Sequence, residues 1–236
     1  MTTHRKRCYF QNCGAEATSA EHIPPKAFFL PDRRVQLMTV PSCPLHNNHK
    51  STDDLYVLAQ VLLNVSPLGR AREIFLKRIK PQLDHAGGAF RRTLMNGAVD
   101  VPGGARKYRV DMARMNNFFD GLCCGIAFKI SGAPLPRDFD FHHVFHNFSS
   151  DPKDSELEEL ERSVLDFYAG DPPEVLKFGQ AGTHSKDVYE VKVFGEPNYL
   201  TSITMVHEFY ESFKVTSFLT RTFDGNGIGV APRANV

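Results

Sequence analysis

Four potential metal ligands near the amino terminus constrain this chain more than any other feature. Cys8 and Cys13 enclose four residues, and Cys43 and His46 enclose two. Two such half-sites, about thirty residues apart, supply four ligands that can close a tetrahedron around zinc. Structural zinc contributes folding free energy outright, so the spacing predicts a zinc-stapled unit here. His49 is an alternative fourth ligand, although a Cys-x2-His spacing suits a tight turn that enters a helix.

An acid and a histidine lie between the half-sites, in the stretch Glu21-His22-Ile23-Pro24-Pro25. Phosphodiester hydrolysis needs a base for the attacking water and a cation for the charge that develops on the phosphate. A neutral histidine suits the base, and carboxylate and amide oxygens suit a hard divalent cation. Neighbouring residues of a strand point to opposite faces. We therefore expect the two prolines to make this strand irregular, so that Glu21 and His22 can act together.

These residues resemble an HNH endonuclease over roughly residues 5–60. The similarity consists of Glu-His-Ile-x-Pro between two zinc half-sites and of Cys-x2-His-Asn-x2-Lys in the second half-site. It implies a ββα-metal motif, in which a hairpin and a helix hold a catalytic metal and a zinc knuckle ties them together. By this resemblance His22 is the general base, Glu21 and Asn47 hold a catalytic magnesium or manganese ion, and Lys50 contacts nucleic acid.

The chain departs from the family on the expected second strand. That strand usually carries an asparagine about five residues before the position of Cys43, and residues 35–40 contain none. Two functions therefore stay open. The first is a metal-dependent endonuclease that cleaves DNA, with RNA also possible because phosphate chemistry alone does not discriminate the sugar. The alternative is a catalytically silent zinc-binding module that docks nucleic acid or a partner protein; the missing asparagine favours it, and the intact Glu21-His22 pair favours the enzyme.

The charge is distributed unevenly along the chain. Residues 1–115 carry 18 Lys and Arg against 9 Asp and Glu, and residues 116–236 carry 10 against 18, so the net charge of +1 hides a basic and an acidic half. A basic surface supplies the salt-sensitive phosphate contacts of nucleic-acid binding, although solvated basic faces are the alternative. The candidate contacts are Arg5, Lys6, Arg7, Arg33, Arg34 and Lys50, followed by Arg70, Arg72, Lys77, Arg78 and Lys80 on a predicted helix.

The expected fold class is α+β. Residues 1–66 form the predicted HNH-like unit and residues 67–236 a mixed region of helices and antiparallel strands, with the charge switch near 115 as the best internal boundary. Periodicity and turn residues predict the elements. Helices are expected over 55–63, 67–80 (with Pro81 after its end), 112–130 and 154–169, a hairpin or two short strands within 89–112, and strands over 139–148, 188–194, 200–206 and 213–219.

Other potential ligands have simpler interpretations. Cys123 and Cys124 lie on a predicted apolar helix without a His or Cys at ligand spacing, which predicts buried thiols. The histidines at 142, 143 and 146 are expected on a half-buried strand, and Asp53 and Asp54 in a first helical turn that they cap.

The composition, 42% hydrophobic and 23% charged, is that of a globular protein, and no signal peptide or membrane-spanning run is recognised. We therefore expect a cytoplasmic protein with no membrane partner, in which five cysteines serve metal binding instead of disulfides. Cleavage of duplex DNA usually needs two active sites, so a homodimer is possible.

Overall fold

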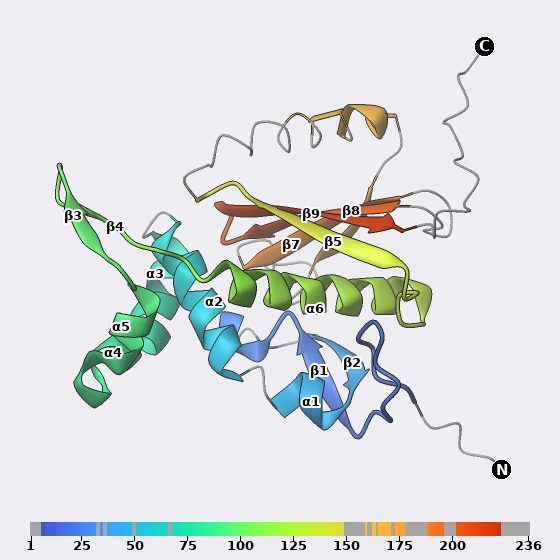
Figure 1. Ribbon diagram of the computed structural model, residues 1–236, viewed down its shortest axis with the longest axis horizontal. Helices are drawn as coiled ribbons and strands as arrows, with labels where there is room; N and C mark the ends of the chain where they lie inside the picture. The colour runs from blue at the N-terminus through green and yellow to red at the C-terminus, as the bar shows by residue number, and fades with distance from the viewer. Residues whose placement is uncertain are drawn as a thin grey trace.

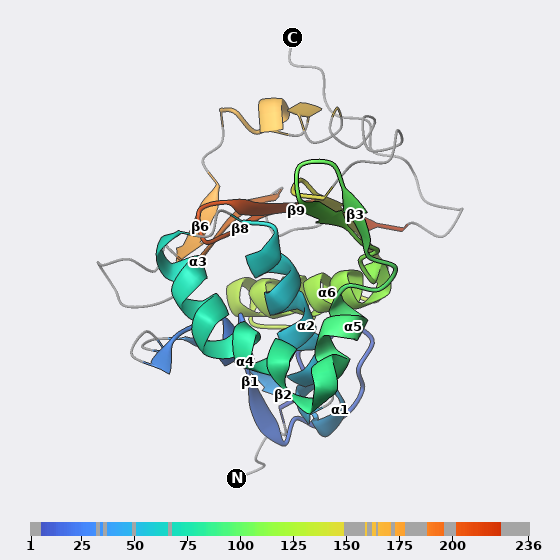
Figure 2. The same cartoon turned by 90° about the vertical axis from the view of Figure 1, so that its left-hand side faces the viewer.

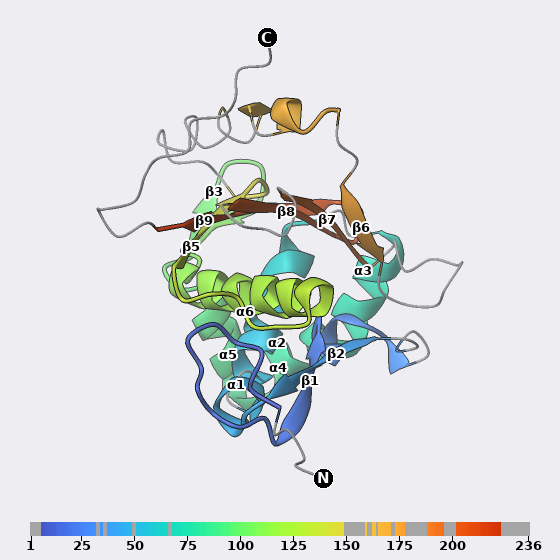
Figure 3. The ribbon, with the colours of Figure 1, turned by 90° about the vertical axis from the view of Figure 1, so that its right-hand side faces the viewer.

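The computed structural model describes residues 6–31, 34, 37–48, 51–65, 68–148, 159, 162–163, 165–170, 173–177, 188–195 and 202–222. These residues form an α+β structure in layers (Figure 1). The central helix α6 (Met112–Ser131) lies between a five-stranded sheet on one side and an amino-terminal hairpin with shorter helices on the other, and Figures 2 and 3 show the same layers from the two ends. The expected α+β class with antiparallel sheets is therefore confirmed.

The amino-terminal layer is built on a short antiparallel hairpin. Strand β1 (Ser19–Ile23) pairs with β2 (Met38–Ser42), and the 3-10 turn η1 (Lys26–Phe28) follows β1. Helix α1 (Pro44–Asn48) begins directly after β2, and α2 (Ser51–Leu63) continues along the same layer. Residues 49–50, between α1 and α2, lie outside the described part.

The predicted end of the next helix is wrong. Helix α3 (Gly69–Ile74) passes through a π-helical turn, η3 (Phe75–Ile79), into α4 (Lys80–Asp84), which contains Pro81. The π-helical turn η3 interrupts the α-helical hydrogen-bond pattern of α3, so Pro81 lies in the first turn of a new helical segment, α4. A missing N–H is tolerated at that position.

The expected hairpin within 89–112 is confirmed only in part. Residues 89–94 are helical, forming α5 (Ala89–Leu94) after the short turn η4 (Ala86–Gly88). The hairpin itself is shorter and joins β3 (Val99–Val101) to β4 (Ala105–Lys107).

Helix α6 forms as predicted and is the centre of the core. The Asp111 side chain caps its first turn by accepting from the Arg114 N–H, and Gly132 ends it in the left-handed conformation. Gly125 allows a close approach to the hairpin, because a Cβ at this position would lie 2.6 Å from Ile23 Cγ1. The helix consequently packs directly on β1.

The five-stranded sheet has the order β5-β9-β8-β7-β6 and is antiparallel throughout. Its strands are β5 (Phe139–Phe145), β6 (Glu174–Lys177), β7 (Tyr189–Gly195), β8 (Ser202–Phe209) and β9 (Phe213–Arg221). The strands expected near 139, 188, 200 and 213 are thus confirmed, with shifted ends. Eight of the sixteen residues of the predicted acidic helix 154–169 lie outside the described part; among the others, residues 159, 162–163 and 165–167 are helical.

One hydrophobic core includes residues from both sides of position 66. Phe28 of the amino-terminal layer packs against Phe118 of α6 and Phe209 of β8, with ring centroids 5.4 and 5.2 Å apart. Gln11 Nε2 donates to the Phe139 carbonyl at 2.9 Å. The hairpin is therefore part of the same packed structure as the sheet.

A buried polar network joins α6 to the inner face of the sheet. Its groups follow in the order Tyr189 Oη, His207 Nδ1 and Nε2, Ser217 Oγ, His143 Nδ1 and Nε2, and Asp120 Oδ1, with successive distances of 2.7, 3.0, 2.8 and 2.9 Å. A single arrangement of protons lets each group of this network donate a hydrogen bond to the next group in the order given. Cys123 and Cys124 are buried as predicted, but Cys123 Sγ lies 3.6 Å from His207 Nε2, a neighbour that sequence spacing does not reveal.

A search of the described residues finds no helix that is both long and apolar enough to cross a membrane.

Candidate metal centre

The first half-site lies in a loop that backbone hydrogen bonds fix against the hairpin. Tyr9 N–H donates to the Pro41 carbonyl of β2 at 2.8 Å, and Cys8 N–H donates to the Ala15 carbonyl at 3.1 Å. Asn12 adopts a left-handed conformation, with φ of 60°, and turns the chain between the two cysteines. As a result, Cys8 and Cys13 face the end of β2.

The second half-site is the junction between β2 and α1. Cys43 directly follows the strand, and its carbonyl accepts the first helical hydrogen bonds, from the N–H groups of His46 and Asn47. The His46 ring is stacked on Phe10, with ring centroids 4.2 Å apart. This packing orients the imidazole toward the cysteines.

The four predicted ligands come together in space. The potential ligand atoms of Cys8, Cys13, Cys43 and His46 all lie within 4.8 Å of one another. Cys13 and Cys43 Sγ are 3.8 Å apart, and His46 Nδ1 is 3.5 Å from Cys8 Sγ and 3.2 Å from Cys43 Sγ. A zinc tetrahedron with bonds of about 2.3 Å to sulfur and about 2.0 Å to nitrogen has edges of about 3.5–3.8 Å. The cluster could therefore hold a metal ion such as zinc.

Disulfide chemistry does not explain this geometry. None of the five cysteines forms a disulfide, and 3.8 Å is well beyond the S–S bond length of about 2.05 Å. Burial raises the pKa of Cys8 to about 11. Burial alone would also raise the pKa of Cys43, but hydrogen bonds from the His46 N–H and from the other two thiols lower it. Cys43 thus loses its proton more readily than an ordinary cysteine, while the buried Cys8 needs the positive charge of a metal to lose its proton.

Glu21 and His22 lie on opposite faces of β1. The pairing of β1 with β2 is unbroken from Ser19 to Ile23, so side chains alternate regularly. Glu21 is buried, whereas His22 is half-buried on the other face. The expected irregularity of this strand is therefore wrong: the prolines follow the paired segment and do not interrupt it.

Asn47 lies on the Glu21 side of the hairpin. Its Nδ2 donates to Ser19 Oγ at 2.8 Å, and Ser19 is two residues before Glu21 on the same face of the strand. Asp53 does not take part, because its carboxylate accepts from Arg114 Nε at 2.7 Å. Within the described residues, no second group of three or more His, Cys, Asp or Glu side chains is placed to hold an ion.

The face of the hairpin that carries His22 has a basic environment. Burial lowers the pKa of His22, and the charges of Lys26 and Arg34 lower it further. A shallow groove of about 350 Å³ follows this face and is lined by Lys6 and by Ala20, Thr39 and Pro41, among other residues. The imidazole is therefore held in its neutral form near neutral pH.

The remaining predicted contacts are placed unevenly. Lys6 and Arg7 are exposed, and the backbone of Arg7 forms a bridge to Glu16. Arg5, Arg33, Lys50 and the alternative ligand His49 lie outside the described residues. Lys26, which no motif singles out, is placed beside His22; its position directly after the two prolines was the available signal.

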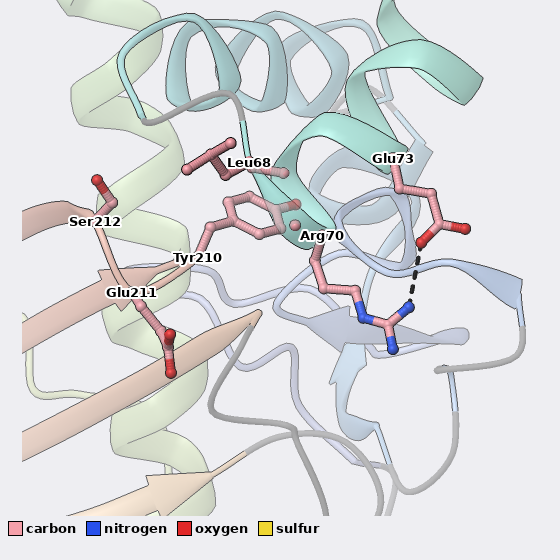
Figure 4. Close-up of a pocket in the computed structure, with 8 residues that line it drawn as sticks. Leu68, Arg70, Glu73, Tyr210, Glu211 and Ser212 are labelled. Carbon is pink, nitrogen blue, oxygen red and sulfur yellow. Dashed lines mark hydrogen bonds and ion pairs between the residues drawn. The ribbon is translucent and has the colours of Figure 1, made fainter.

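A larger depression lies on another side of the molecule, away from the Cys/His cluster. It has a volume of about 660 Å³ and lies between the start of α3 and the turn that joins β8 to β9. Figure 4 shows Tyr210 and Arg70 beside each other in its wall, with Arg70 paired to Glu73 at 3.2 Å. Its lining includes Arg70, one of the predicted phosphate contacts, and none of the predicted metal ligands or catalytic residues.

Comparisons with family models, with curated proteins and with solved structures find no match.

Proposed function

We propose that this protein is a metal-dependent endonuclease of the HNH type that hydrolyses phosphodiester bonds of DNA or RNA. One observation carries the proposal: the Cys8, Cys13, Cys43 and His46 cluster ties the start of a helix to a hairpin whose first strand contains Glu21 and His22. Zinc at this cluster would fix strand β1, strand β2 and helix α1 relative to one another. This arrangement agrees with what the resemblance to HNH endonucleases implies.

His22 is the proposed general base. A base must be unprotonated before it accepts a proton from water, and the lowered pKa of His22 favours the neutral imidazole at neutral pH. The residue is half-buried next to a groove, so the position can be reached by an extended substrate. These features support catalysis more than a purely structural role.

Glu21 and Asn47 are the proposed ligands of the catalytic ion. They offer a buried carboxylate and an amide oxygen, which are suitable donors for magnesium or manganese. When bound, such an ion supplies positive charge to the scissile phosphate. The bond from Asn47 Nδ2 to Ser19 Oγ holds this side chain against the strand that carries Glu21. Two protein ligands are sufficient only when water and substrate oxygens complete the coordination.

A specific observation favours a second candidate, a catalytically silent zinc-binding module. Glu21 and His22 face opposite sides of a regularly paired strand, so one phosphate would contact both only after a local change of β1. A silent module needs no such change. It would use the same zinc-stapled hairpin to dock nucleic acid or a partner protein.

Cleavage assays distinguish the two candidates. Zinc-loaded protein is incubated with supercoiled plasmid and with labelled RNA, in magnesium, in manganese and without a divalent ion. The endonuclease proposal expects nicked or linear products, or shortened RNA, that depend on the added ion and disappear in His22→Ala. If the zinc-loaded protein binds nucleic acid but leaves every substrate intact with both ions, the silent module is the correct function.

A further inference from the structure

The turn η1 is held from two sides by residues that are distant in sequence. Tyr210 Oη donates to the Phe28 carbonyl at 2.9 Å, and Arg34 Nε donates to the Phe29 carbonyl at 3.4 Å. Tyr210 is buried and has a left-handed backbone, with φ of 52°. Such a conformation is costly for a tyrosine and persists where the surrounding structure fixes it. Tyr210 and Arg34 are therefore brought to the same turn by the neighbouring Phe28 and Phe29 carbonyls.

Arg78 reaches the same place from the π-helical turn η3. Ile79 of this turn is fully buried, and η3 packs against α2, so the turn is anchored. Single π-helical turns within α-helices are frequent at functional sites. Arg78 is half-buried beside Arg34 and Tyr210; burial lowers its pKa, and the charge of Arg34 lowers it further. The two half-buried guanidinium groups thus lie close enough for their charges to act on each other.

These two arginines differ from several others in the described part of the chain. Arg70, Arg91 and Arg114 are each paired with a carboxylate, at 3.2, 2.8 and 2.7 Å. Among the ion pairs of the described residues, none joins Arg34 or Arg78 to a carboxylate. Burial penalises the charge of Arg78, and the charge of Arg34 repels it, so an anion that bridges the two side chains would stabilise the arrangement. A phosphate oxygen pair matches the planar fork of each guanidinium.

The pair lies next to the proposed general base. Arg34 and Lys26 are close enough to His22 for their charges to affect it. The groove lined by Lys6 follows the same face of the hairpin, since Ala20 and His22 alternate with the buried Glu21 along β1. Basic groups are therefore present both at the groove, where Lys6 lies, and around His22, where Lys26 and Arg34 act.

We propose that Arg34 and Arg78, flanked by Lys26, form a clamp for one backbone phosphate of a polynucleotide whose chain continues along the hairpin groove toward Lys6. The inference rests on the proposed function, since it identifies how the same site would hold its substrate. The recognised group is the phosphodiester, which DNA and RNA share. Arginine is the favoured residue for such a contact because its donors engage two phosphate oxygens at once.

The test measures binding as a function of salt and is separate from cleavage. Full-length zinc-loaded protein is titrated into labelled oligonucleotides of DNA and of RNA, single-stranded and duplex, between about 50 and 200 mM salt without divalent ion. The variants are Arg34→Gln, Arg78→Gln and Arg78→Lys. Arg91→Gln is the matched control, because Arg91 is exposed on α5 and paired with Asp84. Zinc content and the unfolding midpoint of each variant are compared with those of the wild type.

Each glutamine variant is expected to reduce the slope of log affinity against log salt by about 0.7 to 0.9, the value of one phosphate contact. Between about 50 and 200 mM salt, the factor by which each glutamine variant loses affinity should then be about threefold smaller than that of the wild type. Arg78→Lys keeps the slope but binds more weakly, because it keeps the charge and loses the fork. Arg91→Gln behaves as the wild type.

The outcomes separate this inference from the nuclease proposal. If Arg34→Gln and Arg78→Gln have the slope of Arg91→Gln while the wild type still cleaves, the clamp is wrong and the nuclease stands. If the slopes fall as expected but no substrate is cleaved, the clamp stands and the nuclease is wrong. A wild-type protein that binds none of the oligonucleotides at the lowest salt overturns the clamp. The DNA and RNA arms show which polymer provides the phosphate.

Discussion

Cys43 is the residue on which the amino-terminal unit depends most, because it lies between the strand and the helix and near two other ligands. Zinc binding in small motifs provides roughly 10–16 kcal/mol at neutral pH. This exceeds the stability of many whole domains, which is about 5–15 kcal/mol. We expect Cys43→Ser to lose its zinc and the ordered hairpin. Elemental analysis and amide-proton exchange of residues 8–46 measure both effects.

Cys124→Ser is the matched control for this variant. Cys124 is a buried thiol of α6 and does not belong to the cluster. The Cys124→Ser variant should keep one zinc per chain. An equal loss of zinc in both variants, or zinc-free wild-type protein purified without chelator, would refute the assignment of the ligands.

Substitutions of His22 and Glu21 are expected to impair cleavage in different ways. His22→Ala should reduce cleavage by about 10²- to 10⁴-fold with unchanged zinc content and DNA affinity, because a base acts in the transition state. Glu21→Ala should lose cleavage through weaker binding of the catalytic ion and regain part of it in excess magnesium or manganese. Rate measurements over a range of metal concentrations distinguish these patterns. Wild-type rates in His22→Ala would move the base elsewhere, and His49 would be tested next.

The spacing of ligands along the sequence predicted the Cys/His cluster, whereas contacts between residues that are distant in sequence were not predicted. The ligands were recognisable because Cys-x4-Cys and Cys-x2-His each fit a single turn. The proximity of Arg34 to Arg78 depends on how η3 packs against the hairpin layer, and the contact of Cys123 with His207 spans 84 residues. Neither arrangement leaves a periodic signal. The opposite orientation of Glu21 and His22 follows from ordinary strand alternation, and the expectation that the prolines make β1 irregular was wrong.

At the level of elements, the contact of α6 with β1 depends on Gly125. An alanine Cβ would lie 2.6 and 2.9 Å from two atoms of Ile23, so the helix or the strand must shift. We expect Gly125→Ala to lower the free energy of unfolding by about 1–3 kcal/mol, the usual cost of overpacking. This is opposite in sign to helix propensity, which favours alanine by about 1 kcal/mol. Urea denaturation measures the change.

A double-mutant cycle separates the two effects. In an Ile23→Ala background the clash is removed, and Gly125→Ala should then stabilise the protein. If the substitution is equally destabilising in both backgrounds, contact with Ile23 is not the cause.

Elements with a strong apolar period were predictable, and those that depend on a change of helical register were not. The apolar period of the sequence predicted α6 over nearly its full length, and the alternation of apolar and polar residues did the same for β7. Pro81 suggested a helix end, but the π-helical turn before it provides a new start. Residues 89–94 lack a clear apolar stripe, and only Leu94 of α5 is buried, so their helix depends on packing.

At the scale of the whole molecule, the buried network makes stability depend on pH. Burial lowers the pKa of His207 well below its usual 6.5, and His143 lowers it further. The unfolded chain therefore binds a proton below about pH 6.5 that the folded chain does not, so stability decreases as the pH falls. The decrease should reach about 1.4 kcal/mol per pH unit for this one group until its folded pKa is reached.

His207→Gln isolates this effect, because acid also protonates the metal ligands in both proteins. The other titratable groups facing His207 are Tyr189 of β7, Cys123 of α6 and His143 of β5, and these remain in the variant. Unfolding free energies at several pH values between about 5 and 8 should differ in slope between the two proteins. Equal slopes would show that His207 is not the responsible group.

The continuous core leads to a last prediction, that residues 1–66 do not fold cooperatively on their own even with zinc. Ile23 packs on Gly125, and Phe28 contacts Phe118 and Phe209, so these side chains would be exposed in the fragment. Zinc can still order the four ligands, because they lie within this segment. We therefore expect the zinc-loaded fragment to bind one metal ion but to melt without a sharp transition, whereas the full chain melts cooperatively. Calorimetry of both proteins tests this, and a sharp transition in the fragment would show that the hairpin, α1 and α2 form an independent domain.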